Sequence, residues 1–518
     1  MNIPRKKLPI GIQTFREIRE EDYYYIDKTP LALRLIERGS YYLLSRPRGF
    51  GKSLFLDTLA ELFEGNRALF TGLAAEEHWD WSRRFPVIRL SFAHGVLADR
   101  AELDAKIEEL LAENAARLQV QLDQNTISGQ FGDLIRQAHA NSGERVVVLV
   151  DEYDKPIRDN LTNPETASVL HVGLLNLYSV IKEAGAHIHF ALLAGVCKVS
   201  TSSIFSGLNN LMDLSLDADY SAICGYTDND LDTVFAPELD GLDRAQMRAW
   251  YSGYNWTGES VYNPIDVLQL LQKRKFQPWW FETATPDSLI DVLTERQVFL
   301  PQLSYMLADR SRLLHLELER IAIETLLFQT GHLTIDSNRQ IGVITYYSLH
   351  YPNREVYQSL NNRLLQHWTP DTQNTFRNKT RLGELLLAND FAGLEQLFTA
   401  FYASIPHDWY RNTPIAQYEG YYASIFYAYF ASLGLDLTPE DTSNVGRLDL
   451  ALRFNGNLYL MEFKVVELVP DGRALEQIKA RGYADKYRAE GLPIHLMGIE
   501  FSKEQRALVG FEVETLES

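Results

Sequence analysis

Cysteine is nearly absent from this chain, since only Cys197 and Cys224 occur among its 518 residues. Two cysteines cannot build a disulfide framework or a cysteine-based zinc site, which fits a reducing compartment. Long apolar runs are also missing: the uncharged stretch 421–435 is shorter than the roughly 18 residues that a membrane helix needs. The basic N-terminus has no apolar segment behind it, so we expect no signal peptide, no membrane partner and a cytoplasmic location.

Basic residues are fewer than acidic residues. Lys and Arg together number 50 and Asp and Glu 69, which gives a net charge of −19. This excludes polyanion binding by the surface as a whole, so any nucleic acid must bind at a local basic site. Hydrophobic residues make up 46% of the chain and aromatic residues 12%, which indicates globular domains rather than disorder or a fibre.

The order of apolar and amphipathic segments predicts an α/β protein of more than one domain. Residues 1–240 alternate strand-like and helix-like runs, which is the pattern of a parallel sheet. Residues 241–370 are predicted to be mostly helical and to form a lid or connector, with a polar linker at 367–381. Residues 371–518 place helices before a hairpin and a further helix, so we expect a second, smaller α/β domain.

Residues 41–63 carry a phosphate-binding pattern of strand, loop and helix. The loop ends in Gly51-Lys52-Ser53, where backbone N–H groups can cradle phosphates, the lysine can reach the β- and γ-oxygens, and the serine can bind Mg²⁺. A complete P-loop would have glycine at position 46, where this chain has arginine. The residues expected to contact ATP are Arg48, Gly49, Phe50, Gly51, Lys52, Ser53 and Leu54.

A second strand makes this prediction more specific. Residues 145–150 form a continuous apolar run, as expected of a buried parallel strand, and Asp151 and Glu152 follow it. The first acid can hold the water shell of Mg²⁺, and the second can orient and deprotonate an attacking water. We therefore assign Ser53 and Asp151 to Mg²⁺ and Glu152 to hydrolysis as the general base. Residues 1–240 are thus predicted to be a P-loop ATPase core.

Three basic residues near this loop have roles that the sequence leaves open. Arg46 and Arg48 flank the loop, and each either contacts phosphate or lies solvated on the surface. A third apolar strand, 189–196, comes just before Lys198. This lysine is either a sensor of the γ-phosphate or an ordinary exposed side chain.

A second group of candidate residues lies on a predicted hairpin. Asn455-Gly456 is a strong signal for a two-residue turn, which pairs residues whose numbers sum to 911. Asp449 then faces Glu462, and Lys464 lies on the same face because alternate strand residues point the same way. Two opposed carboxylates would lie about 5 Å apart and repel, so we expect a divalent cation with oxygen ligands there. Lys464 can then activate a water or stabilise charge on a pentavalent phosphate; the alternative is an exposed strand face without a function.

Two flanking segments can extend this site. Glu419 opens a helix-like run and can supply a third acid. Residues 472–491 are predicted to form a helix that includes Gln477. That helix is either a neutral-to-basic surface within an acidic protein or a solvated amphipathic helix. Its basic residues are Arg473, Lys479, Arg481, Lys486 and Arg488.

These motifs resemble two known families. The N-terminal part resembles the bacterial and archaeal AAA-ATPase-like family of P-loop proteins in residues 11–29, 46–56, 146–157, 204–211 and 261–268. The C-terminal part resembles the PD-(D/E)XK nuclease superfamily, in the branch fused to that ATPase, at Glu419 and in residues 446–452, 459–465 and 474–487. The family usually carries a second arginine in the phosphate loop, where this chain has Gly49.

The resemblance implies a fold and a set of site residues. It implies a P-loop NTPase with a parallel sheet, joined to a smaller domain of restriction-endonuclease-like α/β fold. It also implies Mg²⁺ binding by Asp449 and Glu462 and a role in the chemistry for Lys464. Glu419 and Gln477 would complete that site.

The sequence supports three hypotheses about function. The first is a protein that binds and hydrolyses ATP and carries a Mg²⁺-dependent nuclease site for DNA or RNA. The second is a nucleotide-driven switch or scaffold whose nuclease-like domain binds nucleic acid or a partner without cleaving it, and the third is an ATPase with no link to nucleic acid. No catalytic arginine is identifiable in the sequence, and a neighbouring subunit of a homo-oligomer would explain this.

Overall fold

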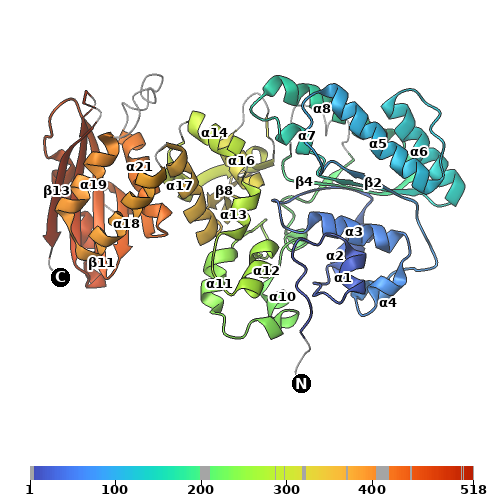
Figure 1. Ribbon diagram of the computed structural model, residues 1–518, viewed down its shortest axis with the longest axis horizontal. Helices are drawn as coiled ribbons and strands as arrows, with labels where there is room; N and C mark the ends of the chain where they lie inside the picture. The colour runs from blue at the N-terminus through green and yellow to red at the C-terminus, as the bar shows by residue number, and fades with distance from the viewer. Residues whose placement is uncertain are drawn as a thin grey trace. The chain divides into compact units, whose positions relative to one another are not determined.

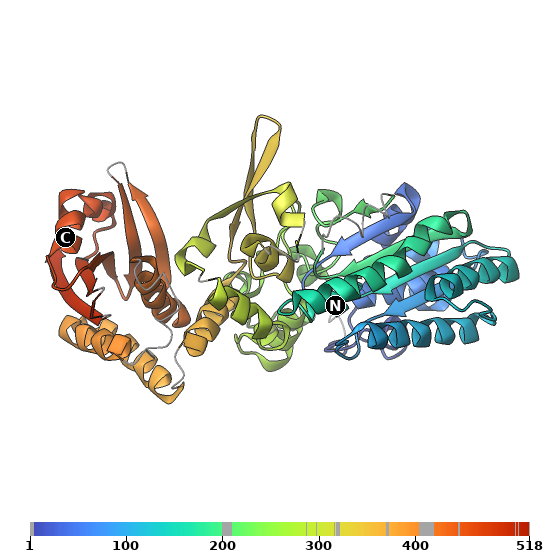
Figure 2. The ribbon, with the colours of Figure 1, turned by 90° about the horizontal axis from the view of Figure 1, so that it is seen from above.

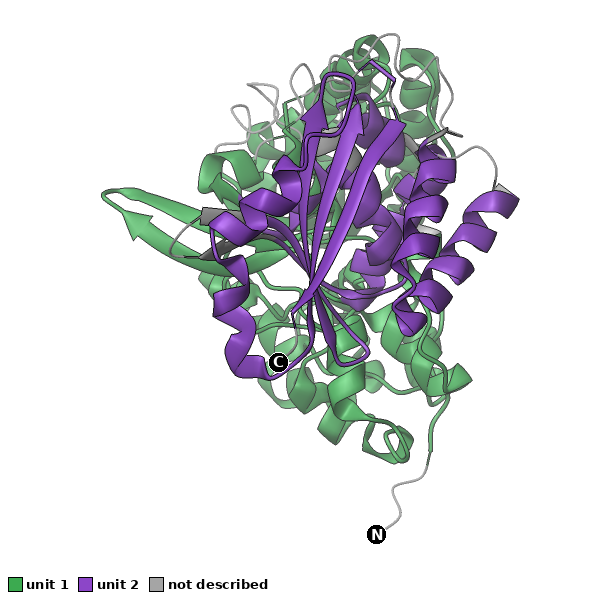
Figure 3. Cartoon of the chain, turned by 90° about the vertical axis from the view of Figure 1, so that its left-hand side faces the viewer, with its two compact units in different colours: residues 1–284, 307–353 green, residues 285–306, 354–518 purple. Residues whose placement is uncertain are grey.

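A computed structural model (Figure 1) describes residues 5–198, 210–285, 287–296, 298–314, 316–317, 322–368, 372–403, 419–443, 446–502, 504–505 and 507–516. The chain divides into two compact units, shown in different colours in Figure 3. Unit 1 comprises residues 1–284 and 307–353, and unit 2 comprises residues 285–306 and 354–518. The chain therefore leaves unit 1, returns to it, and leaves it a second time.

Five parallel strands form the sheet of unit 1, in the order β2-β3-β4-β1-β5. Their bounds are Tyr41–Ser45 for β1, Val87–Ser91 for β2, Val146–Asp151 for β3, Ile188–Gly195 for β4 and Met212–Asp213 for β5. Helices cover the sheet on both faces (Figure 1), with α5 (Arg100–Leu118), α6 (Ile127–Ser142) and α8 (Pro164–Glu183) on one and α3 (Lys52–Phe63) on the other. This burial on both sides explains the unbroken apolar run of β3. The predicted parallel α/β core is confirmed.

The carboxyl ends of these strands lie at one edge of the sheet. Ser45 of β1 is in register with Gly195 of β4, and Asp151 of β3 is in register with Ala194. The loop after β1 and the acids after β3 therefore meet at this edge, which is where open parallel sheets bind ligands.

Unit 1 contains further helices beside those that cover the sheet. They are α1 (Phe15–Glu20), α2 (Thr29–Arg38), η1 (Arg67–Phe70), α4 (Ala74–His78), α7 (Lys155–Arg158), η2 (Gly185–His187), η3 (Ala218–Tyr220), α10 (Asp228–Thr233), η4 (Ala236–Glu238), α11 (Arg244–Tyr251), α12 (Pro264–Lys273), α13 (Trp279–Ala284), α15 (Arg310–Leu314) and α16 (Ile323–Thr330). α12 begins at an Asn-Pro pair, in which the Asn263 side chain caps the helix by accepting from the backbone N–H of Ile265.

The middle of the chain contains a β-hairpin that the sequence did not predict. β7 (Thr334–Ile341) pairs antiparallel with β8 (Ile344–His350), and β6 (Met306–Asp309) completes the sheet in the order β6-β8-β7. Figure 2 shows this hairpin standing away from the helices around it. Most of β7 is polar and exposed, so it lacks the alternation that would have marked it as a strand.

Unit 2 is built on a five-stranded mixed sheet in the order β13-β12-β11-β10-β9. Its strands are β9 (Asp436–Ser443), β10 (Gly446–Phe454), β11 (Asn457–Val466), β12 (Ile494–Ser502) and β13 (Ala507–Leu516). Its helices are α14 (Asp287–Glu295), η5 (Leu300–Ser304), α17 (Arg354–Trp368), α18 (Thr372–Ala388), α19 (Phe391–Ala403), α21 (Glu419–Ser432), α22 (Arg473–Ala480) and η7 (Tyr483–Glu490). The end of α17 and the start of α18 occupy most of the segment 367–381 that was predicted to be a linker.

Alternate residues of β11 pack on opposite faces of this sheet. Leu458 and Leu460 share a buried cluster with Ile478 of α22. Phe463 lies on the other face, where its ring packs 5.3 Å from Phe426 of α21. Residues 462 and 464 have the parity of Leu458 and Leu460, so the sequence places them on the face that α22 covers.

Candidate functional site

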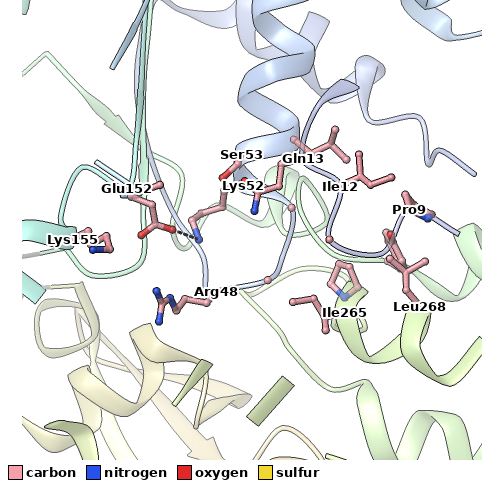
Figure 4. Close-up of a pocket in the computed structure, with 17 residues that line it drawn as sticks. Pro9, Ile12, Gln13, Arg48, Lys52, Ser53, Glu152, Lys155, Ile265 and Leu268 are labelled. Carbon is pink, nitrogen blue, oxygen red and sulfur yellow. Dashed lines mark ion pairs between the residues drawn. The ribbon is translucent and has the colours of Figure 1, made fainter. Parts of the chain in front are cut away.

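Lys52 begins α3 and lies inside the loop that precedes it. Its side chain is 3% exposed, and its ammonium donates to the carbonyl oxygens of Arg46 and Pro47, each at 3.1 Å. The same Nζ lies 3.8 Å from Oε1 of Glu152 (Figure 4). The lysine is thus held at the centre of the loop, opposite the acid that follows β3.

Two glycines allow the loop to take this path. Gly51, the N-cap of α3, has φ 92°, and Gly49 has φ 78°, both in the left-handed region that favours glycine. A Cβ at Gly49 would lie 2.6 Å from Cδ1 of Ile265, so α12 leaves no room for a side chain there. Trp280 fixes the same stretch of loop by donating from Nε1 to the carbonyl oxygen of Arg48 at 2.7 Å.

Ser53 and Asp151, the two residues predicted to bind Mg²⁺ in unit 1, come together. Burial raises the pKa of Asp151, while a hydrogen bond from Ser53 and the charge of Lys52 partly oppose that rise. A carboxylate and a hydroxyl at this position are hard oxygen ligands of the kind that Mg²⁺ takes beside nucleotide phosphates. The side chains therefore fit the expected nucleotide-bound cation.

Glu152 is held as a carboxylate by two cations. Burial alone would raise its pKa, but the charges of Lys52 and Arg158 lower it to about 2. The Arg158 guanidinium donates to Oε2 of Glu152 at 2.9 Å. The backbone of Glu152 has φ 51°, a left-handed value that is rare outside glycine and that occurs at functional sites under strain.

Asp154 and Arg158 are site residues that the sequence analysis did not single out. Asp154 is fully buried and accepts from the backbone N–H groups of Val196 at 3.0 Å and Cys197 at 2.7 Å. Its other contact is the Arg158 guanidinium at 3.0 Å, so one arginine joins Asp154 to Glu152. This network ties the end of β4 to the predicted base. An Asp and an Arg four residues apart just after a strand were the available signal.

The basic residues with open roles are now placed. Arg46 is 1% exposed and donates to three backbone carbonyls, those of Ser45, Ser215 and Tyr220, so it is neither a phosphate ligand nor a solvated side chain. Lys198 is 9% exposed and forms an ion pair with Asp213 at 2.8 Å, so it is not an ordinary surface lysine. Arg48 is exposed and lines the cavity beside Glu152.

A cavity of about 330 Å³ opens over the phosphate loop. Its charged side holds Lys52, Glu152 and Lys155, whereas the other side is formed mainly by apolar residues of the N-terminal segment and α12 (Figure 4). The lining residues predicted from the sequence are Arg48, Gly49, Gly51, Lys52, Ser53, Leu54 and Glu152, and those not predicted include Pro9, Ile12, Gln13, Tyr226, Pro264, Ile265 and Leu268. Phe50 points elsewhere: its ring packs in the core against Tyr254 and Trp256.

In unit 2 the predicted hairpin register is confirmed. Phe454 pairs with Asn457 across a turn in which Asn455 and Gly456 both have positive φ, and the pairing continues to Leu450 with Met461. Beyond that pair, a carboxylate oxygen of Asp449 accepts from the backbone N–H of Phe463 at 2.8 Å. Asp449 therefore lies against the stretch of β11 that contains Glu462.

Glu462 is 1% exposed and contacts two of the other predicted residues. Gln477 of α22 donates from Nε2 to Oε1 of Glu462. The ammonium of Lys464 lies 3.5 Å from the same oxygen. An acid, an amide and a lysine from β11 and α22 thus meet on the face that α22 covers. The side chain of Glu419, at the start of α21, lies outside the described residues.

This arrangement provides two carboxylates for a cation. Within the described residues, no group of three or more His, Cys, Asp or Glu side chains gathers as a metal cluster. Mg²⁺ commonly binds through one or two carboxylates and keeps several waters, so Asp449 and Glu462 fit such an ion. Which residues act in catalysis stays a prediction from the sequence.

Glu500 is a further residue that the sequence analysis did not mark. It is 2% exposed on β12, in register with Lys464 of β11. Its carboxylate accepts from three backbone N–H groups at the start of α22, those of Asp471, Gly472 and Ala474, at 2.8, 3.2 and 3.1 Å. A buried acid thus fixes the helix that carries Gln477.

Comparisons with known proteins agree with this architecture. Residues 9–205 match the family described as predicted AAA-ATPase, and residues 417–510 match the PD-(D/E)XK nuclease superfamily. An uncharacterized protein in the vnfD 5′ region of Azotobacter chroococcum is 61% identical over 513 residues, which is 99% of each chain. No solved structure matches the chain. Among the described helices, none is both long and apolar enough to cross a membrane.

Proposed function

The chain belongs to the proteins that join an AAA-ATPase-like domain to a PD-(D/E)XK nuclease superfamily domain, and we propose that it hydrolyses ATP and cleaves nucleic acid. The observation that carries this proposal is the presence of two separate sets of polar residues, one in each unit. One set surrounds Lys52 at the carboxyl edge of the parallel sheet, and the other surrounds Glu462 on the mixed sheet.

For the ATPase, each residue has a role that follows from its position. Lys52 and the loop N–H groups bind the β- and γ-phosphates, and Ser53 and Asp151 hold Mg²⁺. Glu152 orients the attacking water and accepts its proton, while Arg158 positions Glu152. The apolar wall of the cavity, formed by Ile12, Ile265 and Leu268 among others, contacts the adenine ring of ATP.

For the nuclease, Asp449 and Glu462 hold Mg²⁺, which stabilises the charge that develops on the phosphate. Gln477 fixes the orientation of the Glu462 carboxylate. The Lys464 ammonium hydrogen-bonds the attacking water or a phosphate oxygen. Water adds to phosphorus, one P–O ester bond breaks, and the leaving oxygen takes up a proton. The substrate is DNA or RNA.

The test uses the purified full-length protein with Mg²⁺, ATP and labelled DNA and RNA. We expect phosphate release from ATP that Lys52→Ala abolishes, and cleavage of one of the nucleic acids that Glu462→Ala abolishes. Cleavage by wild type no greater than that by Glu462→Ala, with and without ATP, would contradict the nuclease. Phosphate release by wild type no greater than that by Lys52→Ala would contradict the ATPase.

A further inference from the structure

The acidic pair of unit 2 carries more negative charge than the side chains of its own strands offset. Asp449 and Glu462 bring two negative charges, and Lys464 returns one positive charge. A phosphodiester adds another negative charge, and the chain as a whole carries −19. A Mg²⁺ ion held by the two acids would offset their charge at the phosphate that is cleaved, but in a chain this acidic the adjoining backbone phosphates need a cation that the protein itself supplies.

Arg481, at the end of α22, can supply such a cation because of its position on the helix. Gln477 lies on α22 and contacts Glu462, and Arg481 follows it by four residues, directly after the helix ends. Ala474 and Ile478 of the same stripe are buried against the sheet. Positions four apart on a helix share a face, so Arg481 is one turn beyond Gln477 on the side of the acidic pair. Its backbone N–H still donates to the carbonyl of Gln477 at 3.0 Å.

Three of the other four cations of this segment have acidic partners of their own, and the ammonium of Lys486 lies 5.4 Å from the centre of the Tyr487 ring. Arg473 pairs with Asp471 at 2.8 Å, Lys479 with Glu514 at 2.6 Å, and Arg488 with Asp485 at 2.8 Å. The described contact of Arg481 is different, because its guanidinium donates to the neutral hydroxyl of Tyr483 at 3.1 Å. Tyr483 is 2% exposed and holds the exposed arginine in place without neutralising its charge.

The electrostatics agree with this placement. The hydrogen bond to Tyr483 is the largest contribution that raises the pKa of Arg481, and the charges of Glu462 and Asp449 add to it. Both carboxylates therefore favour the charged form of this guanidinium.

We propose that Arg481 binds a backbone phosphate of the nucleic acid beside the Asp449–Glu462 pair, an inference that rests on the proposed nuclease function. A planar guanidinium offers two parallel N–H donors to a phosphate, which a surface lysine does not. Arg481 thereby draws the phosphodiester towards the two acids and Lys464 in a protein whose surface otherwise repels it.

The experiment measures binding apart from cleavage. Fluorescence anisotropy follows a labelled DNA duplex and an RNA of the same sequence binding to the full-length protein, with Ca²⁺ in place of Mg²⁺ and over a range of salt. We expect Arg481→Ala to weaken binding of the preferred nucleic acid roughly tenfold at low salt and to lower the slope of log affinity against log salt by about one. Arg488→Ala, on the same segment and already paired, is the matched control and should leave both quantities near wild type.

Two further variants separate a phosphate contact from a structural role. Arg481→Lys should recover part of the affinity, because it keeps the charge but loses the paired donors. Arg481→Glu should bind more weakly than Arg481→Ala, because only charge beside the phosphate orders the variants this way. Equal affinities for the Lys, Ala and Glu variants, or an unchanged salt slope in Arg481→Ala, would overturn the inference. If wild type still cleaves nucleic acid in that case, the proposed nuclease function stands. Arginine-dependent binding without any cleavage would support the inference and overturn the nuclease. Failure of wild type to bind either probe would overturn both.

Discussion

At the scale of single residues, two arginines that look equivalent in the sequence have opposite roles. Arg46 stands where a complete P-loop has glycine, yet its guanidinium is turned into the protein, where it stacks 4.1 Å from the ring of Trp256 and bonds three carbonyls. Arg48 lines the cavity. A sequence pattern gives no direction to a side chain, so only packing could separate them.

This difference predicts two distinct phenotypes. Arg46→Met leaves three buried carbonyls without their donor and should destabilise unit 1 by about 3 kcal/mol, with ATP affinity per folded molecule within about twofold of wild type. Arg48→Ala should leave the melting temperature unchanged and weaken ATP binding about tenfold, the effect of losing one charge-assisted hydrogen bond. Thermal unfolding and calorimetric titration with a non-hydrolysable ATP analogue measure both. Loss of stability from Arg48→Ala, with ATP affinity intact, would reverse the two assignments.

His332 predicts a pH dependence of stability. It is buried beside Trp280, and burial lowers its pKa to about 3, whereas an unfolded histidine has a pKa of about 6.5. Between these values the unfolded chain binds a proton that the folded chain does not, so stability falls as the pH falls through this window. The loss amounts to about 2 kcal/mol between pH 7 and pH 5.

Urea unfolding at the two pH values measures this effect. His332→Asn should lose less stability on acidification than wild type, because it removes the titrating group. His78→Asn changes an exposed histidine and should keep the full dependence. A His332→Asn curve parallel to that of wild type would mean that this imidazole does not couple folding to pH.

At the scale of elements, local signals in the sequence predicted one β-hairpin and missed another. Asn455-Gly456 predicted the β10–β11 register because both residues accept positive φ and the turn fixes every later pair. The β7–β8 hairpin was missed, since its mostly exposed first strand needs no apolar face and so has no period to detect. Contacts between distant segments, such as Ile265 against the phosphate loop, leave no local pattern at all.

The start of α22 is held by one acidic side chain, in addition to the apolar contacts of the helix with the sheet. Glu500 accepts three N–H groups at the start of the helix, which the helix itself leaves without partners. Glu500→Gln should weaken this anchor by about 1–3 kcal/mol and let Gln477 move away from Glu462. We expect faster hydrogen exchange at residues 473–478 and slower nucleic acid cleavage.

Glu514→Gln provides the matched control for α22. It removes an acid that contacts the same helix through Lys479, but at an exposed position. Exchange and cleavage should stay near wild type in this variant. If the two variants exchange alike over residues 473–478, the anchoring role of Glu500 is wrong.

At the scale of the whole molecule, the central question is how two sites in two units serve one function. In unit 1, Glu152, the proposed general base, forms ion pairs with two cations, Lys52 and Arg158. We expect ATP phosphates to compete for Lys52 and release one of these ion pairs, which would change the surroundings of Glu152 when ATP binds. Arg158 also pairs with Asp154, which accepts from backbone N–H groups at the end of β4, so this strand end is joined to the same network. An ATP-regulated nuclease and an ATP-driven switch both need such a device, and they differ in what unit 2 does with it.

Two variants distinguish these hypotheses. If ATP gates a nuclease, Lys52→Ala should cleave nucleic acid at one rate whether or not ATP is present, while wild type changes its rate at least severalfold on adding ATP. Glu462→Ala should hydrolyse ATP at the wild-type rate and cleave nothing, because its change lies in the other unit.

If the chain is a switch or scaffold, ATP should instead change the mass seen by light scattering, and Lys52→Ala should abolish that change. Glu462→Ala should then behave as wild type in every assay. Cleavage that ATP does not alter in wild type would exclude gating, and it would leave the two sites as independent activities on one chain.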